Sequence, residues 1–208
     1  MAFVIRSALV VGSVVAALSV TSTQCAASDP FSNLTAEVAY SPAVENWFVI
    51  FRKLDRDHTL LGACVDNNVK VTECSAARQL HDIIEDGKTQ NGLALIGHIN
   101  RGVNFMIKPV TPSGWLSPVE AINGGGDCKA YSIAKYFALL EAGIAADHLR
   151  LVIVHAPAQS GNHMVVAALW QNRWLILDNL TLVLVPDTLS DYVPLLVLDD
   201  KGVRSYAR

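Results

Sequence analysis

The sequence has few charged residues and no excess of basic ones. Only 17% of its 208 residues are charged, and 16 lysines and arginines stand against 19 aspartates and glutamates. Proteins that bind nucleic acid need a basic surface to hold phosphates, so the composition argues against a nucleic-acid partner. With 51% apolar residues, a chain of this length can build a full hydrophobic core, and we expect one domain.

The sequence also lacks internal repeats and has no apolar run long enough to cross a membrane. The longest candidate, residues 8–20, is short of the roughly 20 residues that a transmembrane helix needs. It follows Arg6 and leads to small residues at Cys25 and Ala27, which is the layout of a secretory signal. We therefore expect residues 1–27 to be a signal peptide.

Cleavage after Ala27 leaves residues 28–208 as a single domain without a transmembrane segment, exported to an oxidising compartment. The alternatives for the first segment are an uncleaved membrane anchor and a lipoprotein modified at Cys25. Gln24 fits poorly before a lipidated cysteine, which argues against the second alternative.

Cysteine is scarce, and the signal removes one of the four. Cys64 and Cys74 bracket a polar loop, and a disulfide that closes such a loop stabilises a fold by about 2 to 3 kcal/mol. We therefore expect these two to pair. Cys128 is then left over, and an unpaired thiol in an exported protein is either buried and inert or kept for chemistry.

Apolar residues at helical spacing predict helices in the first two thirds of the chain. They are expected at residues 44–54, 75–87, 92–104 and 128–142. Asp127 is placed to cap the last helix and Gly143 to end it. Before that helix, prolines and three consecutive glycines indicate a long ordered loop over residues 107–126, and loops of that length are usually functional.

Runs of valine, isoleucine and leucine predict strands in the last third of the chain. They are expected at residues 149–155, 163–170, 174–177 and 182–185. Helices followed by strands indicate an α+β domain, in which N-terminal helices pack on one face of an antiparallel sheet.

Cys128 follows three glycines and Asp127, in the first turn of the strongest predicted helix. The free N–H groups and the dipole of a helix N-terminus favour a thiolate there. Glycines next to it allow a substrate backbone to come close. The alternative is a flexible turn before a buried structural cysteine.

A nucleophilic cysteine needs a base, and His163 is our candidate among six histidines. It opens an otherwise apolar strand, whereas its rival His155 ends the strand before. The remaining four lie in surface-like or helical contexts. The alternative for His163 is a core histidine bonded to backbone groups.

Asp178 is our candidate to orient the imidazole, because it ends the strand that follows. A two-residue loop at 171–172 pairs Trp170 with Arg173 and places Asp178 one diagonal step from His163 on the same face of the sheet. A bulge in that turn would break this argument, and an aspartate at a strand end is often a turn residue. With the cysteine, the two residues complete a nucleophile, a base and an orienting group.

Three segments resemble the bacterial transglutaminase-like cysteine peptidases: residues 125–136, 162–165 and 177–180. The resemblance extends upstream to residues 100–104, Trp115, Cys64 and Cys74, and it covers most of the mature chain. It implies a papain-like or transglutaminase-like core with a catalytic triad of Cys128, His163 and Asp178.

The best-understood members of that family are the LapG proteases. They reside in the periplasm and clip large surface adhesins, which disperses biofilm, and an inner-membrane receptor for cyclic di-GMP restrains them. The resemblance therefore implies a periplasmic cysteine endopeptidase with a protein substrate, such as an adhesin, and such a receptor as a partner. Two other functions stay open: amide transfer of the transglutaminase type, and a non-catalytic binding module of the same fold.

The residues after the nucleophile depart from the LapG pattern. LapG-type members bind calcium with acidic residues at positions where this chain has Lys129 and Ala130. A lysine repels a cation, and calcium needs several oxygen ligands, which Asp127 alone does not supply. We therefore expect no metal site, no cofactor and an activity that does not need calcium.

Cleavage of a peptide bond also needs donors for the oxyanion that forms on the carbonyl oxygen. The backbone N–H of Cys128 is placed for this role at the start of its helix. We expect a second donor from the preceding loop, at Trp115.

Overall fold

The computed structural model describes residues 28–32, 35–65, 74–111, 114–157 and 161–207. The predicted signal peptide, residues 1–27, lies outside the described part of the chain. Within that part, no helix combines the length and the apolar character needed to span a membrane.

Five α-helices form in the described residues. They are α1 (Pro42–Val65), α2 (Cys74–Lys88), α3 (Leu93–Met106), α4 (Pro118–Gly124) and α5 (Cys128–Glu141). The four predicted helices are confirmed as α1, α2, α3 and α5, although α1 continues well beyond residue 54. It does so because its buried stripe keeps a spacing of three and four residues as far as Leu61 and Cys64.

Helix α4 lies inside the segment that the sequence predicted as a loop, so that prediction is wrong for residues 118–124. Ser117 caps the helix: its side chain accepts the N–H of Glu120, and the carboxylate of Glu120 accepts the N–H of Ser117 at 2.8 Å. Pro118 takes the first helical position, where no backbone N–H is needed. This capping box overrides the helix-breaking composition around it.

In the part of the chain that the structure describes, seven strands form one sheet in the order β1-β7-β6-β2-β3-β4-β5, and all neighbouring strands run antiparallel. They are β1 (Thr35–Glu37), β2 (Leu149–His155), β3 (Asn162–Trp170), β4 (Arg173–Leu177), β5 (Val185–Pro186), β6 (Val193–Asp199) and β7 (Gly202–Tyr206). The first three predicted strands are confirmed as β2, β3 and β4. The strand predicted at 182–185 is wrong except for its last residue, because Leu182 and Val183 are exposed on a loop.

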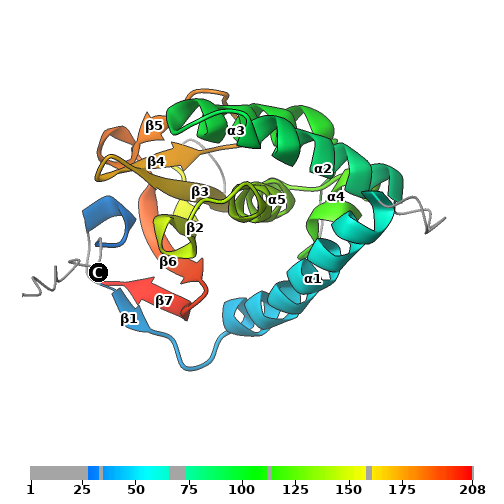
Figure 1. Ribbon diagram of the computed structural model, residues 1–208. Coiled ribbons are helices and arrows are strands. Elements are labelled where there is room, and N and C mark those ends of the chain that lie inside the picture. The colour runs from blue at the N-terminus through cyan, green and yellow to red at the C-terminus, as the bar shows by residue number, and fades with distance from the viewer. Residues whose placement is uncertain (1–27, 33–34, 66–73, 112–113, 158–160, 208) are drawn as a thin grey trace, which may run out of the picture.

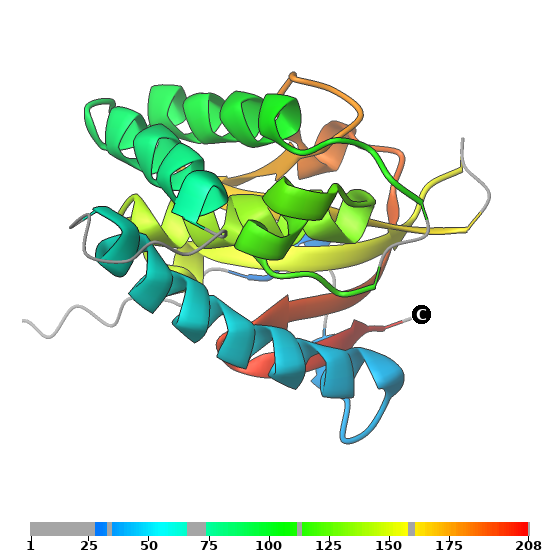
Figure 2. The ribbon, with the colours of Figure 1, turned by 90° about the vertical axis from the view of Figure 1, so that its right-hand side faces the viewer.

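The helices cover one face of the sheet in two tiers. Figure 1 shows α5 next to β2 and β3, with the other helices outside it, and Figure 2 shows α1, α2 and α3 as the outermost elements. All residues of α5 from Ala130 to Leu139 are buried, as expected for a helix enclosed on every side. The arrangement confirms the predicted α+β class, with N-terminal helices on an antiparallel sheet.

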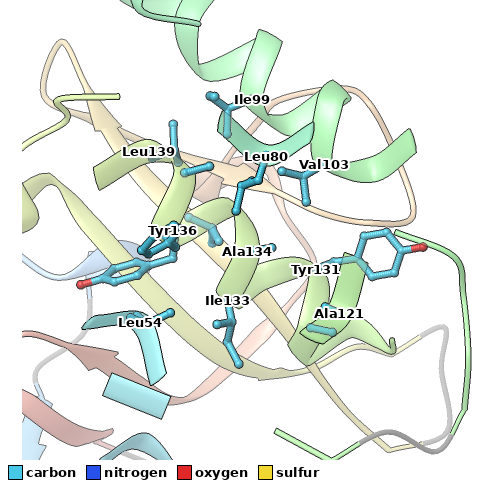
Figure 3. Packing of buried hydrophobic residues seen from close by; sticks show 14 of the residues in the cluster. Leu54, Leu80, Ile99, Val103, Ala121, Tyr131, Ile133, Ala134, Tyr136 and Leu139 are labelled. Carbon is cyan, nitrogen blue, oxygen red and sulfur yellow. The ribbon is translucent and has the colours of Figure 1, made fainter. Parts of the chain in front are cut away.

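The main core forms where α5 meets the outer helices. Figure 3 shows its centre, which includes Leu54, Leu80, Ile99, Val103, Ile133, Ala134, Tyr136 and Leu139. Each fully buried aliphatic side chain of this kind contributes about 1.5 to 3 kcal/mol. The helix that carries Cys128 at its first position is therefore held rigidly from all sides.

The predicted disulfide between Cys64 and Cys74 is confirmed. It joins the end of α1 to the start of α2, with 5.3 Å between the two Cα atoms. Cys128 is the free cysteine of the described residues, and it is half-buried.

Candidate active site

The backbone before α5 places Cys128 at the start of the helix. Asp127 caps α5 by accepting the N–H of Lys129 at 3.1 Å, as predicted. Before it, Gly126 bonds in both directions to an extended segment: it donates to the carbonyl of Lys108 at 2.9 Å and accepts from Val110 at 3.0 Å. A Cβ atom on Gly126 would lie 2.2 Å from that of Ala130, so only glycine fits at this position.

His163 and Asp178 meet at the open end of the β3–β4 hairpin. Trp170 pairs with Arg173 around the two-residue turn, as predicted, so no bulge disturbs the register. Nε2 of His163 donates to Oδ1 of Asp178 at 2.9 Å, and both side chains are buried, with 3% of each residue exposed. The rival His155 is exposed at the end of β2.

His163 also interacts with Cys128, so the histidine lies between the cysteine and the aspartate. Burial lowers the pKa of His163, but hydrogen bonds to the side chains of Asp178 and Cys128 raise it to about 9. Since Nε2 is used by Asp178, the ring nitrogen left for Cys128 is Nδ1. The imidazole is therefore protonated at neutral pH beside the sulfur, where it can donate a proton during catalysis.

Tyr192 is a third partner of this group that the sequence analysis missed. Its hydroxyl donates to Oδ2 of Asp178 at 2.5 Å, and its ring contacts that of His163 edge to face, with 5.9 Å between centroids. Burial raises the pKa of Asp178, but the bonds from His163, Tyr192 and the N–H of Leu180 lower it below the ordinary value. Tyr192 stands in a loop far from every motif, so no sequence pattern marks it.

Asn104 and Asn100 of α3 hold the loop that follows Asp178. The side-chain amide of Asn104 donates to the carbonyls of Asp178 at 2.9 Å and Thr181 at 3.2 Å, and that of Asn100 reaches the carbonyl of Leu182 at 3.4 Å. The sequence marked this part of α3 only through the family resemblance. Its role is to fix the aspartate's backbone.

A cavity of about 250 Å³ opens over Cys128 and His163. Its lining comes from the segment before α4, from the start of α5 and from the loops around β3 and β4. The lining residues are Pro109, Val110, Thr111, Gly126, Asp127, Cys128, Tyr131, Asn162, His163, Asn179 and Leu180. Trp115 is not part of this lining and packs half-buried against the main core. Its expected role as an oxyanion donor stays a prediction.

The residues that follow the nucleophile do not fit a calcium ion. Both oxygens of Asp127 interact with Lys129: Oδ1 accepts its backbone N–H, and Oδ2 forms an ion pair with its ammonium. Ala130 is fully buried and offers no side-chain oxygen. Among the described residues, no three histidine, cysteine, aspartate or glutamate side chains gather as a metal site. The cation that pairs with Asp127 is the ammonium group of Lys129.

Comparisons with known proteins identify the family of this chain. The family model of the bacterial transglutaminase-like cysteine proteinases matches residues 63–196, which include Cys128, His163 and Asp178. No curated protein matches the chain.

Solved structures of Legionella pneumophila LapG share the fold. One is 24% identical, covers 73% of this chain and 87% of its own, and has a TM-score of 0.59. A calcium-bound form is 23% identical, covers 74% of this chain and 87% of its own, and has a TM-score of 0.58. An EGTA-treated form is 23% identical, covers 73% of this chain and 86% of its own, and has a TM-score of 0.60. The expected transglutaminase-like core is thereby confirmed.

Proposed function

Because the chain belongs to the bacterial transglutaminase-like cysteine proteinases and is a cysteine peptidase, we propose that it is an exported endopeptidase that cleaves a protein substrate through an acyl-enzyme on Cys128. The observation that carries this proposal is the position of His163, bonded to both Cys128 and Asp178 beneath an open cavity. It matches the arrangement of nucleophile, base and orienting group that covalent catalysis requires.

In the proposed mechanism, the thiolate of Cys128 attacks the carbonyl carbon of the scissile peptide. The backbone N–H of Cys128 stabilises the oxyanion, and Trp115 is the predicted second donor. The imidazolium of His163 then gives its proton to the leaving amine, and the C–N bond breaks. The neutral ring next takes a proton from water, which attacks the thioester and releases the acid, and Cys128 returns as a thiolate. Asp178 and Tyr192 keep the ring in place throughout.

The proposed location is the periplasm. The predicted signal at residues 1–27 supports export, and the Cys64–Cys74 disulfide supports an oxidising compartment, because such bonds rarely persist in the cytosol. The structural likeness to LapG and the family resemblance support a large surface adhesin as the substrate and an inner-membrane receptor for cyclic di-GMP as the regulator.

The proposed activity does not depend on calcium. An ammonium group, that of Lys129, neutralises Asp127 at the position where the related LapG pattern has acidic residues. This internal ion pair supports the cap of α5 without a metal ion. Added calcium and a chelator should therefore leave cleavage unchanged.

Cleavage of surface proteins by the purified mature chain, residues 28–208, tests the proposal. Cells of the source organism are incubated with this protein or with its Cys128→Ala variant, and released fragments are identified by their new N-termini. We expect fragments that depend on Cys128. Fragments that form equally with the alanine variant would contradict the mechanism, and cross-linked products in place of fragments would point to amide transfer instead.

A further inference from the structure

The face of the sheet that carries His163 and Asp178 is not the face that the helices cover. Side chains alternate between the two faces along a strand, so His163 shares a face with Val165, and Asp178 shares it with Ile176. Val165 and Ile176 belong to a second buried cluster, separate from the main core. Figure 1 shows the N-terminal turn, in dark blue, on the side of the sheet away from α5. The segments that cover this second face therefore border the catalytic pair.

Two of those segments are the N-terminal arm, residues 28–32, and a turn at residues 187–192, which we call the Tyr192 turn. Phe31 of the arm and Tyr192 at the end of the turn both pack against the second cluster. The two segments are joined directly, because the N–H of Phe31 donates to Oδ2 of Asp187 at 2.6 Å. Asp187 begins the turn, and it is buried. The arm thus holds the start of the turn.

Hydrogen bonds within the turn connect Asp187 to Tyr192. Oδ1 of Asp187 accepts the N–H of Thr188 at 2.8 Å, and the carbonyl of Asp187 accepts the N–H of Ser190 at 3.1 Å. The hydroxyl of Ser190 accepts the N–H of Tyr192 at 3.2 Å. Strand β6 begins directly after Tyr192. The tyrosine that bonds to Asp178 therefore has its backbone fixed by the turn on one side and by the sheet on the other.

The arm is itself anchored at its start. The carboxylate of Asp29 accepts from Nε of Arg150 and from the hydroxyl of Thr35, both at 2.8 Å. The carbonyl of Ser28 accepts from Nε1 of Trp174, also at 2.8 Å. Arg150 and Trp174 are buried, so both donors sit in a rigid part of the sheet. The arm is thus bonded to the body of the protein on both sides of the residue that leads to Phe31.

The backbone of the arm is strained where it meets the turn. Phe31 has a φ of 66° and Ser32 a φ of 52°, in the left-handed region that non-glycine residues rarely adopt. Such strain persists only where the surrounding contacts hold it. Here these contacts are the bond to Asp187 and the ring of Phe31, which packs edge to face on Tyr206 with 6.3 Å between centroids. The strained conformation brings the N–H of Phe31 to Asp187.

We propose that the N-terminal arm is a positioning element of the active site: the arm holds Asp187, Asp187 holds the Tyr192 turn, and Tyr192 fixes Asp178 and thereby the His163 ring. This inference rests on the proposed function. Asp187, Tyr192 and the arm lie outside the lining of the cavity over Cys128, so they act without touching the substrate. Displacing the arm should therefore slow the enzyme from a distance.

Asp187→Asn tests the link to the arm, because an amide keeps the size of the side chain but offers one acceptor oxygen in place of two. The rate of iodoacetamide labelling of Cys128 is measured in the chain of residues 28–208 at about pH 6.5, below the ordinary pKa of a thiol. Labelling at this pH requires the imidazolium of His163 to be held beside the sulfur. We expect the rate to fall by about three- to tenfold, and no further than in Tyr192→Phe.

Asp191→Asn is the matched control. It makes the same change in the same turn, one residue before Tyr192, at an exposed position that forms no hydrogen bond to the arm within the described residues. Its labelling rate should equal that of the wild type. A loss as large as that in Asp187→Asn would show that any loss of charge in the turn slows labelling, and it would contradict the proposed contact.

A double variant tests whether Asp187 acts through Tyr192. Once Tyr192→Phe has removed the bond to Asp178, Asp187→Asn should lower the labelling rate no further. Losses that multiply would contradict this route. All variants should label at the wild-type rate above about pH 9.5, where a thiol ionises without help. A slow rate there would mean that access to Cys128 has changed, and it would overturn a role in positioning.

Removal of the arm tests its own part in the site. A chain that starts at residue 33 should label as slowly as Asp187→Asn, and adding Asp187→Asn to it should have no further effect. Cooperative thermal melting above the assay temperature shows first that each variant is folded; if the shortened chain is not, Asp187→Asn and its double variant decide the question. Wild-type labelling of Asp187→Asn would overturn the inference and leave the triad intact. Slow labelling of the wild type itself below pH 8 is a different outcome, in which the proposed function fails first.

Discussion

The hydroxyl of Tyr192 and the imidazole of His163 bind different oxygens of the same carboxylate, at 2.5 Å and 2.9 Å. Asp178 is therefore fixed from two sides, and it can rotate only if it gives up one of these bonds. The orientation of His163 thus depends on a tyrosine that lies fourteen residues after Asp178 in the chain.

Tyr192→Phe should lower kcat/KM for cleavage by about 10- to 150-fold, because a hydrogen bond to a charged group contributes about 1.5 to 3 kcal/mol. The pKa of Asp178 should rise at the same time, since that bond helps to lower it. Tyr40→Phe is the control, as Tyr40 is 75% exposed. Equal kcat/KM values in the wild type and Tyr192→Phe would show that the bond has no role in catalysis.

The raised pKa of His163 predicts both reactivity and stability on the alkaline side. The folded-state pKa of about 9 exceeds the ordinary value of 6.5, so its stabilising contribution is complete below about pH 6.5 and is lost as the pH rises through 9. Asp178→Asn removes the main bond that raises this pKa. The alkaline limb of kcat/KM for cleavage, where the imidazolium that protonates the leaving amine is lost, should then move from near pH 9 towards neutral, and an unmoved limb would contradict the assigned cause.

Gly126→Ala should abolish most of the activity, because the added Cβ would lie 2.2 Å from that of Ala130 and displace the start of α5. Gly124→Ala is a matched control two residues away, where an added Cβ meets nothing within 4 Å. We expect the control to retain the wild-type rate of Cys128 labelling. Similar rates in the two variants would mean that this close contact does not position the cysteine.

The disulfide should contribute stability without affecting the chemistry. Replacing Cys64 and Cys74 by serine opens a loop with a sequence separation of 10. The free energy of unfolding should fall by about 3 kcal/mol. In a domain of this size, that loss lowers the melting temperature by about 6 to 12 °C. The pH profile of Cys128 labelling should stay the same. A changed profile would place the bond in the active-site machinery.

A chelator tests the replacement of calcium by Lys129. Activity in the presence of EGTA should equal that with added calcium, because both oxygens of Asp127 already interact with Lys129. Loss of cleavage on chelation, restored by calcium, would contradict this expectation.

Much of the site follows from local signals in the sequence. Asp127, Cys128 and the glycines before them indicate a capped helix with a reactive first residue, and the hairpin turn fixes the relation of His163 to Asp178 through strand pairing alone. These predictions work because each depends on residues close together in the chain.

Other features depend on contacts between distant segments, which local patterns do not contain. Tyr192 reaches Asp178 only because β6 pairs with β2 in the centre of the sheet. Strand β6 itself escapes the pattern because Pro194 interrupts it, and β1 has only three residues. Strand β7 contains Gly202, Arg204 and Ser205 and therefore no apolar run. Conversely, the two leucines and two valines of residues 182–185 suggest a strand, yet the bonds from Asn100 and Asn104 hold this segment as a loop.

The most direct test of the central claim is the rate of iodoacetamide labelling of Cys128 against pH, in the purified mature protein and in His163→Ala. The proposed Cys128–His163 pair predicts rapid labelling well below pH 8 that is lost in the variant. Slow labelling in both proteins would contradict the activated cysteine and favour a non-catalytic binding module of the same fold.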